Sequence, residues 1–436
     1  MAEQISTTKL RNFFNQLQDR PLEPDDPFYE NFLERQPEHD PIRELATRIF
    51  WSDDASVNLL SGQRGSGKST ELRRLRKYLM DEEDCLVLLC DMRDYLNLTQ
   101  PVEITDFFIS LMTGLNLEIR DIAGKDFSQR NYWDRLIDFL KQDLKIKDIE
   151  LEGELPGGKI GISASLKDDP TFKIRLQEQL RGHVYKVVNQ AHEFAREMVT
   201  SIRQRENDPS KKVVLIIDSV EQIRGVGEDA NKVYQSVENL FSAHADKLYI
   251  PLLHVVYTTP PYLVPLAPNL GQILGGSSIC NLPSIHIRKR DGSPDYTGLS
   301  TMRQILERRY SDYRSVFTEE QVDRMALSTS GDFRSFFRLV RDCLVKAAST
   351  SRISIPDSVI TDAENHLLRD MLPIADDDKA WLRKISASKS PELPTVEKLP
   401  QLARFFDTHL VMNYRNAEDW YDINPLLSAE IAKDGS

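Results

Sequence analysis

Residues 62–70 read Gly62-Gln-Arg-Gly-Ser-Gly-Lys-Ser-Thr70 and match the pattern G-x-x-x-x-G-K-[ST]. This pattern is typical of a loop that binds phosphate. The glycines let backbone N–H groups approach phosphate oxygens, the lysine reaches the β- and γ-phosphates, and the next hydroxyl binds Mg²⁺. The expected nucleotide-binding residues are therefore Gly62, Gln63, Arg64, Gly65, Ser66, Gly67, Lys68, Ser69 and Thr70.

The segments on either side of this loop support the assignment. Residues 57–60 are a short apolar run that predicts a buried strand, and the leucines of residues 71–80 recur at helical spacing. The phosphate would then lie at a helix N-terminus, where N–H groups and the helix dipole favour an anion. The alternative, a surface turn rich in glycine and serine, does not account for a strand before the loop and a helix after it.

Length and composition indicate a water-soluble chain of two or three domains. The chain has 436 residues, which is more than a single hydrophobic core usually organises. Of these residues, 40% are hydrophobic and 28% are charged. No apolar run approaches the ~18 residues of a membrane span, and the first residues lack the pattern of a signal peptide. We therefore expect a cytoplasmic location and no membrane contact.

Charge and cysteine content exclude two further classes. The net charge of −12 argues against a protein that coats nucleic acid, although a local basic surface stays possible. Four cysteines stand at positions 85, 90, 280 and 343, without C-x-x-C spacing or histidines at metal-ligand intervals. They predict buried thiols rather than a metal or redox site.

The order of patterns along the chain predicts an α/β fold. Residues 1–39 are polar and punctuated by prolines, so we expect an arm outside the packed core. After Asp40 and Pro41, which suit the start of a helix, residues 42–50 have apolar side chains at helical spacing and predict a helix. Continuous apolar runs at 85–90, 213–217 and 249–257 predict strands of a parallel sheet with helices on both faces. The nucleotide-binding core would span residues 40–285.

A long insertion is expected at about residues 98–212 of this core. Residues 146–164 alternate around Pro156-Gly157-Gly158, which predicts a β-hairpin. Apolar residues then recur every three or four positions from 176 to 198, which predicts one long helix. We favour packing of this helix within its own domain over an intermolecular coiled coil, because the stripe is short by heptad standards.

Two polar strand ends are candidates for catalytic roles. Asp218 follows the apolar run 213–217, where a carboxylate can hold Mg²⁺ opposite the Ser69 hydroxyl, as in a Walker B element. The alternative for Asp218 is a helix cap. Thr258 ends the run 249–257, where its hydroxyl would order the attacking water. An equally good interpretation is that threonine simply ends this strand before Pro260-Pro261.

A further motif brings the family resemblance. Gly331-Asp-Phe-Arg334 opens a predicted helix, with Arg334 in the first turn. Phosphate loop, Walker B aspartate, polar strand end and Gly-Asp-x-Arg, in this order, resemble an AAA+ ATPase, and the last motif is similar to the second sensor of the replication-initiator clade. The resemblance implies a helical lid at residues 286–372, from which Arg334 reaches the γ-phosphate.

The C-terminal segment adds a second resemblance. Helical patterns at 379–385 and 399–406 precede alternating runs at 409–414 and 420–423 around residues 415–418. Two helices followed by a hairpin suggest a winged-helix domain at residues 373–436. The pattern of Tyr414-Arg-Asn416 and Trp420-Tyr421 is similar to C-terminal domains of bacterial AAA+/STAND-like regulatory ATPases.

The sequence departs from the AAA+ pattern next to Asp218. Hydrolases of this family usually carry glutamate directly after the Walker B aspartate, but this chain has Ser219, and the nearest acid is Glu221. If a turn follows Asp218, Glu221 can still act as the general base, directly or through one water. If a helix begins there, Glu221 is displaced by most of a turn. We therefore expect slow hydrolysis of ATP.

The resemblance also implies that a neighbouring subunit completes the site with an arginine, which would make the protein a homo-oligomer. Candidates are Arg288, Arg290, Arg308 and Arg309. Each of them taken alone is better explained as a solvated surface charge, so only the group is informative.

Three functions follow, from different classes. The favoured one is an oligomeric switch ATPase that binds ATP and ADP and relays a trigger to a partner effector protein, with anti-phage defence as the expected setting. The alternative is a DNA-binding initiator or loader. Residues 400–407 offer only Arg404, and the turn offers Arg415 beside two acids, so nucleic acid is possible but not favoured. A small-molecule kinase lacks support, because the domains after Asp218 resemble a lid rather than a substrate-binding cap.

Overall fold

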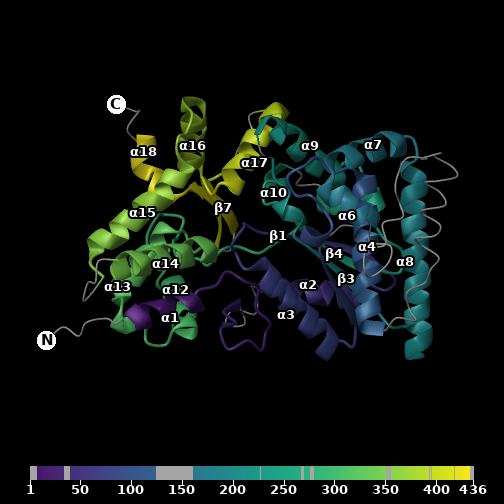
Figure 1. The fold of residues 1–436 in the computed structure, drawn as a ribbon, viewed down its shortest axis with the longest axis horizontal. Helices are drawn as coiled ribbons and strands as arrows, with labels where there is room; N and C mark the ends of the chain where they lie inside the picture. The colour runs from purple at the N-terminus through teal and green to yellow at the C-terminus, as the bar shows by residue number, and fades with distance from the viewer. Residues whose placement is uncertain are drawn as a thin grey trace. The chain divides into compact units, whose positions relative to one another are not determined.

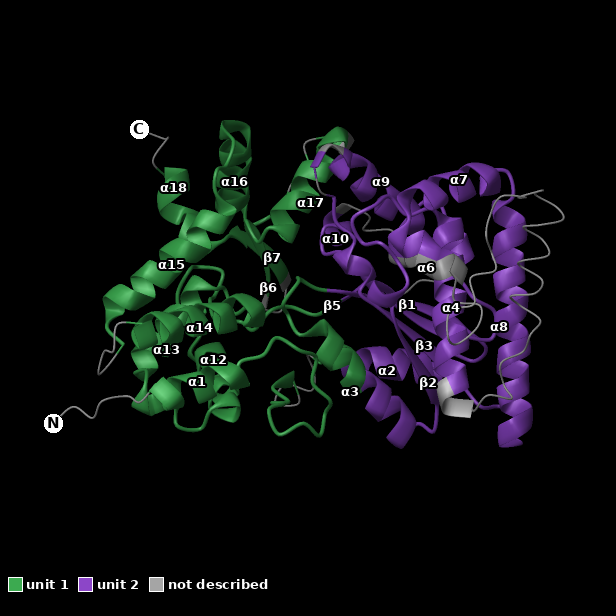
Figure 2. Cartoon of the chain, viewed as in Figure 1, with its two compact units in different colours: residues 1–41, 62–74, 281–436 green, residues 42–61, 75–280 purple. Residues whose placement is uncertain are grey.

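The computed structural model describes residues 7–33, 40–123, 161–225, 227–266, 270–274, 279–349, 355–391, 393, 395–416 and 418–432. The chain forms two compact units (Figure 2). Unit 1 comprises residues 1–41, 62–74 and 281–436, and unit 2 comprises residues 42–61 and 75–280. The phosphate loop therefore groups with the C-terminal half of the chain, although it follows directly on a strand of unit 2.

Unit 2 is built on the predicted sheet (Figure 1). Its strands are β1 (Ser56–Ser61), β2 (Leu86–Asp91), β3 (Val213–Asp218), β4 (His254–Thr259) and β5 (Cys280–Asn281). Their order is β2-β3-β4-β1-β5, and the pairs β2–β3, β3–β4 and β4–β1 are parallel. Every residue of β3 and β4 is buried, which explains why β3 is an almost continuous apolar run in the sequence.

Helices accompany this sheet in unit 2, and two of them, α4 (Ile104–Ala123) and α9 (Ala230–Phe241), pack on it through aromatic side chains. The others include α2 (Pro41–Trp51), with the short helices α10 (Leu263–Leu266) and α11 (Leu270–Ile273) after β4. Phe107 of α4 and Phe241 of α9 both contact the ring of Tyr257 in β4, at centroid distances of 6.0 and 6.3 Å. The α/β class with its phosphate loop is confirmed.

Two expectations for unit 2 are wrong, and a third is contradicted only at its last four residues. The long helix expected at 176–198 is two helices, α7 (Pro170–Leu180) and α8 (Val184–Glu206), which are separated at Gly182, the residue with the weakest helix propensity in this stretch. Residues 161–164 of the expected hairpin belong to α6 (Gly161–Asp168), and residues 146–160 lie outside the described residues. The strand expected from residue 249 begins only at His254, because Leu252 has a positive φ of 65°.

Unit 1 contains the predicted helical region. Its helices are α12 (Tyr296–Arg309), α13 (Glu319–Ser328), α14 (Phe333–Ser349) and α15 (Asp357–Met371), which share one hydrophobic core. Helix α1 (Thr7–Gln16) adds Leu10 and Phe13 to this core, and Phe13 stacks on Tyr310 at 4.4 Å. The expectation that residues 1–39 lie outside the packed core is therefore wrong for α1, whose apolar residues are too few to predict burial.

The C-terminal part of unit 1 has the expected order of elements. Helices α16 (Asp376–Ser388) and α17 (Leu399–Asp407) precede strands β6 (Val411–Asn416) and β7 (Glu418–Ile423), and α18 (Ser428–Ala432) follows. The two strands pair antiparallel, and Tyr414 stacks on Trp420 at 4.3 Å between ring centroids. The predicted hairpin is confirmed. Among the helices of the described residues, none combines the length and the apolar character that a bilayer crossing needs.

Candidate nucleotide-binding site

The phosphate loop of unit 1 has the backbone conformation that its glycines allow. Gly65 and Gly67 have φ angles of 89° and 93°, a region that side-chain-bearing residues rarely adopt. The N–H of Ser66 donates to the carbonyl of Gln63 at 3.1 Å and closes a tight turn. Helix α3 (Lys68–Asp81) begins directly after Gly67, so the first amides of a helix face the loop.

Lys68 lies against the loop itself. The residue is 4% exposed, and its Nζ donates to the carbonyl oxygens of Gly62 at 2.7 Å and Gln63 at 2.9 Å. A phosphate oxygen is a stronger acceptor than a backbone carbonyl, because it carries charge. The ammonium group is therefore held beside the loop in a position from which bound phosphates would recruit it.

The Gly331-Asp-Phe-Arg334 motif contacts the loop directly. A β-carbon built on Gly65 would lie 1.9 Å from Oδ2 of Asp332, and the N–H of Phe333 donates to the Gly65 carbonyl at 3.2 Å. A β-carbon on Gly67 would lie 3.3 Å from the ring of Phe333. The start of α14 is therefore packed on the glycines of the phosphate loop.

Arg334 lies in the first turn of α14, as expected. Its Nε forms an ion pair with Oδ2 of Asp19 at 2.5 Å, and both side chains are partly exposed, at 40% and 51%. An exposed pair of this kind contributes little to stability, so Arg334 can exchange this partner for another anion.

A second contact to the loop comes from the C-terminal hairpin, and the sequence analysis missed it. Nε2 of Gln63 donates to the carbonyl of Val411 at 2.8 Å, and Oε1 of Gln63 accepts from the N–H of Asn413 at 3.1 Å. His409, just before β6, is buried with its Nδ1 3.8 Å from Oδ1 of Asp332. Burial lowers the pKa of His409 and outweighs the opposing effect of the Asp332 carboxylate.

The N-terminal segment contacts the helix that follows the loop. The hydroxyl of Thr70 accepts from the N–H of Leu22 at 3.1 Å, and Arg73 pairs with Glu23 at 2.9 Å. Arg74 forms two hydrogen bonds of 2.7 Å with the carboxylate of Asp40. These contacts join chain segments that no local sequence pattern connects.

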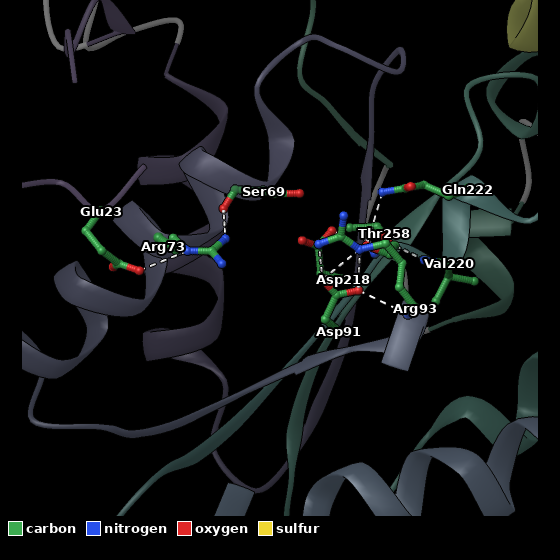
Figure 3. Close-up of polar contacts among 10 residues, drawn as sticks. Glu23, Ser69, Arg73, Asp91, Arg93, Asp218, Val220, Gln222 and Thr258 are labelled. Atoms are coloured by element: carbon green, nitrogen blue, oxygen red, sulfur yellow. Dashed lines mark hydrogen bonds and ion pairs between the residues drawn. The ribbon is translucent and has the colours of Figure 1, made fainter. Parts of the chain in front are cut away.

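In unit 2, Asp218 ends β3 and is 2% exposed. Its Oδ1 accepts the N–H of Ser219 at 2.7 Å. The hydroxyl of Thr258 accepts from the N–H of Val220 at 3.1 Å and donates to the carbonyl of Ile217 at 3.3 Å (Figure 3). These hydrogen bonds of Thr258 stabilise the turn after Asp218. A role of Thr258 in ordering water stays a prediction.

Glu221 lies in a helical turn. Ser219 has a φ of 70°, and residues Val220–Gln222 then form a 3₁₀ turn in which Glu221 is 7% exposed. This is the condition under which the sequence analysis expects Glu221 to be displaced. Its role as general base stays a prediction.

Two residues that the sequence analysis did not consider lie beside Asp218. Asp91, the last residue of β2, is the register partner of Asp218, and Arg93 pairs with the Asp91 carboxylate (Figure 3). An acid directly after the apolar run 85–90 was the available signal, since carboxyl ends of parallel strands meet at one edge of a sheet.

The candidate arginines for a neighbouring subunit differ in exposure and surroundings. Arg308 pairs with Glu30 at 2.9 Å, and Arg309, 6% exposed, lies between the rings of Phe28 and Phe337 at 5.3 and 5.1 Å. Arg290 is exposed and Arg288 is half-buried.

The residues present fit a nucleotide with Mg²⁺. The hydroxyl of Ser66 is buried and has no hydrogen-bond partner among the described residues, as expected of a group that faces phosphate oxygens. No cluster of three or more metal-binding side chains occurs in the part of the chain that the structure describes. That Ser69 and Asp218 hold Mg²⁺ stays a prediction.

Comparisons with known proteins add only distant likenesses. No family model and no curated protein matches the chain. Among solved structures, the Aeropyrum pernix ORC2 protein in its ADPNP–ADP complexes is 11% identical, with a TM-score of 0.41 over 95% of this chain and 94% of that chain. Cdc6p from Pyrobaculum aerophilum is 14% identical, with a TM-score of 0.39 over 95% and 98%. A variant of Thermotoga maritima RuvB is 11% identical, with a TM-score of 0.37 over 94% and 100%.

The fold and the loop together define a class. The strand order β2-β3-β4-β1-β5, the phosphate loop directly after β1, the helical region and the C-terminal hairpin make this an α/β P-loop fold.

Proposed function

We propose that this protein is an ATP-binding, slowly hydrolysing switch ATPase that works as a homo-oligomer. The observation that carries the proposal is the packing of the phosphate loop in unit 1. Asp332 and Phe333 of the lid contact Gly65 and Gly67, and the C-terminal hairpin contacts Gln63. A change in the loop on nucleotide binding therefore has two direct routes, one to the lid and one to the C-terminal domain.

Each residue of the site has a role in this proposal. Lys68 transfers its hydrogen bonds from the loop carbonyls to the β- and γ-phosphates, and Ser69 and Asp218 hold Mg²⁺. When bound, the ion neutralises charge on the phosphates. Arg334 leaves Asp19 for the γ-phosphate, so that the position of the lid reports whether ATP or ADP is bound. Glu221 and Thr258 remain candidates for orienting water.

Slow hydrolysis follows from the residue after Asp218. A serine at position 219 cannot accept the proton of the attacking water as a glutamate would, and Glu221 is buried in the next turn. A long-lived ATP state suits a switch, in which the lifetime of the state matters more than the flux. An arginine from a neighbouring subunit would then set the rate, and Arg290 and Arg308 are the exposed candidates.

Two biological roles remain, and the domain order favours the initiator-like or loader alternative. A P-loop core, a helical lid and two helices with a hairpin follow one another in the described residues, which is the order that the initiator resemblance implies. The relay to an effector protein in anti-phage defence has no supporting observation of this kind. The low number of basic residues on α17 argues for a protein partner at the C-terminal domain in either role.

The experiment compares the full chain without nucleotide, with ADP and with a non-hydrolysable ATP analogue by hydrogen exchange. We expect protection to differ between ADP and the analogue at the start of α14 and in residues 409–424, and we expect phosphate release at a low rate. Lys68→Ala is the control that removes these differences. Identical exchange in all three states would contradict the switch, and absence of nucleotide binding would contradict the whole proposal.

A further inference from the structure

The carboxyl ends of β2 and β3 bring two carboxylates together. Asp91 and Asp218 are the last residues of their strands and are register partners. Neighbouring strands lie about 4.8 Å apart, so the two side chains start from adjacent positions. The same edge contains the end of β1, whose last residue, Ser61, precedes Gly62 of the phosphate loop. Ligands of open α/β sheets bind at this edge.

Ser219 links the two strands. It occupies the position after Asp218 where a glutamate is usual, and its positive φ of 70° turns the chain at once. Its N–H donates to Oδ1 of Asp218 at 2.7 Å, and its side chain lies close enough to Asp91 to lower the pKa of that carboxylate. The nearest acid along the chain, Glu221, is buried, whereas the Asp91 side chain is 23% exposed. The accessible carboxylate at this edge therefore comes from the neighbouring strand.

Arg93 holds this carboxylate in one orientation. Its Nε donates to Oδ1 and Oδ2 of Asp91 at 3.0 and 2.9 Å, and its Nη2 donates to Oδ2 at 2.5 Å. Burial raises the pKa of Asp91, but hydrogen bonds from Arg93 and Ser219 outweigh this effect, and the net shift of the pKa is downward. Asp218 lies close enough to raise the pKa of Arg93, so a fixed positive charge faces both acids (Figure 3).

We propose that Asp91 is the catalytic carboxylate of this ATPase and that Arg93 is its positioning residue. The proposal rests on the ATPase function proposed above. The oxygen of one water attacks the γ-phosphorus, the bond from that phosphorus to the β,γ-bridging oxygen breaks, and ADP leaves with the electron pair. The proton of the water passes to Asp91 and then to solvent, which gives ADP and inorganic phosphate. Asp91 thus takes the place of the glutamate that position 219 lacks, and its lowered pKa makes it a weak base, in agreement with slow hydrolysis.

The main test replaces Asp91 by its neutral isostere. We expect Asp91→Asn to lower phosphate release by about 10²-fold or more, the usual contribution of a general base, with unchanged affinity for a fluorescent ATP analogue. Asp94→Asn is the matched control, since Asp94 is an exposed acid three residues away in the same short segment. It should retain wild-type turnover. The proposal would be overturned if Asp91→Asn released phosphate at the wild-type rate. It would also be overturned if Glu221→Gln showed the expected loss of turnover and Asp91→Asn did not.

A rescue distinguishes a catalytic role from a structural one. Ser219→Glu in the Asp91→Asn background restores the acid at the usual position, and we expect it to recover at least a tenth of the lost turnover. Failure of this recovery in a variant that still binds the ATP analogue would count against the proposal. If the wild-type chain binds no ATP, or if Lys68→Ala still hydrolyses it, the proposed function itself fails, which separates the two outcomes.

A measurement without nucleotide tests the contact between Arg93 and Asp91. Hydrogen exchange of residues 91–96 should rise to the same extent in Arg93→Ala, Asp91→Asn and the double variant, because each removes the same interaction. Arg93→Ala should also move the acidic limb of the pH–rate profile upward, since the pKa of Asp91 is no longer held down, and Arg93→Lys should restore part of this shift. Additive exchange effects, or an unchanged pH profile, would remove Arg93 from the proposal.

Discussion

The side chain of Gln63 pairs with the backbone of Val411–Asn413 as a neighbouring strand would. Nε2 donates to the carbonyl of Val411 at 2.8 Å, and Oε1 accepts from the N–H of Asn413 at 3.1 Å. Gln63 is 1% exposed, so these bonds are shielded from water. A variable position of the phosphate loop is therefore fixed to the edge of the C-terminal hairpin.

Removal of this pairing should loosen the hairpin. Gln63→Ala leaves a buried N–H and a buried carbonyl without their partner, which costs on the order of 1–3 kcal/mol each at most. We expect faster hydrogen exchange in residues 409–424 and a lower free energy of unfolding in urea. Lys77→Ala, an exposed change on helix α3 after the loop, is the control and should alter neither. Equal exchange in Gln63→Ala and wild type would show that the contact is not maintained in solution.

The elements predicted from sequence are those whose signal is local. Short apolar runs predict β1 and β3, because burial acts on adjacent residues. The glycines after β1 predict the turn that leads into α3. Arg334 in the first turn of α14 follows from Gly331-Asp332 in the same way.

The contacts that surround the loop could not be predicted because they are not local. Gln63 and Val411 are 348 positions apart, and nothing in either segment indicates the other. The break between α7 and α8 was missed for a different reason. Residues 181–183 interrupt the helix without interrupting the apolar period, so the stripe appears continuous.

The assignment of the nucleotide site predicts that Lys68→Ala abolishes ATP binding. The ammonium of Lys68 is a fixed positive charge of the loop, and it is already in contact with Gly62 and Gln63. A titration with a fluorescent nucleotide measures this, and circular dichroism confirms that the variant is folded. Lys77→Ala again serves as the control. Wild-type affinity in a folded Lys68→Ala protein would contradict the assignment.

A buried acid in unit 2 predicts a dependence of stability on pH. Burial raises the pKa of Asp106 to about 6, against the opposing effects of Lys173 at 3.9 Å and of Gln177. Since the folded pKa lies above the unfolded value of 3.8, the folded state binds the proton more tightly. The stability from this group is present below about pH 4 and is lost as the pH rises through about 6.

The measurement compares wild type with Asp106→Asn by urea denaturation from pH 4 to pH 7. The free energy of unfolding of wild type should fall relative to the variant over this range, by about 3 kcal/mol at most. The comparison cancels the other titrating groups, apart from Lys173, whose own pKa is lowered by burial. A difference that stays constant or rises with pH would show that Asp106 is ionised without penalty.

Assembly should control turnover if an arginine acts between subunits. The specific activity of the purified protein should then rise with its concentration, and Arg290→Ala should flatten this rise. Lys289→Ala, the exposed neighbour, is the control and should leave the rise intact. A specific activity that is constant across concentrations would mean that one chain completes its own site.

The domain order favours contact between the C-terminal domain and DNA, whereas the charges of this domain argue against such contact. Each phosphate that a basic residue neutralises adds nearly one unit to the salt dependence of binding, so specific duplex binding requires several Lys or Arg residues. On α17 the basic residue is Arg404, which pairs with Asp378. Lys389 pairs with Asp422 at 2.5 Å.

With these groups engaged, we expect the full chain to bind duplex DNA only in the weak non-specific range, with Kd values of roughly 10⁻⁴ M or higher at physiological salt, with and without ATP. Fluorescence anisotropy of a labelled duplex at several salt concentrations measures this. Arg404→Ala should have no effect on the residual binding, because its guanidinium is held by Asp378. Micromolar or tighter binding that falls steeply with salt would contradict the charge argument and would establish contact with DNA as the role of the C-terminal domain.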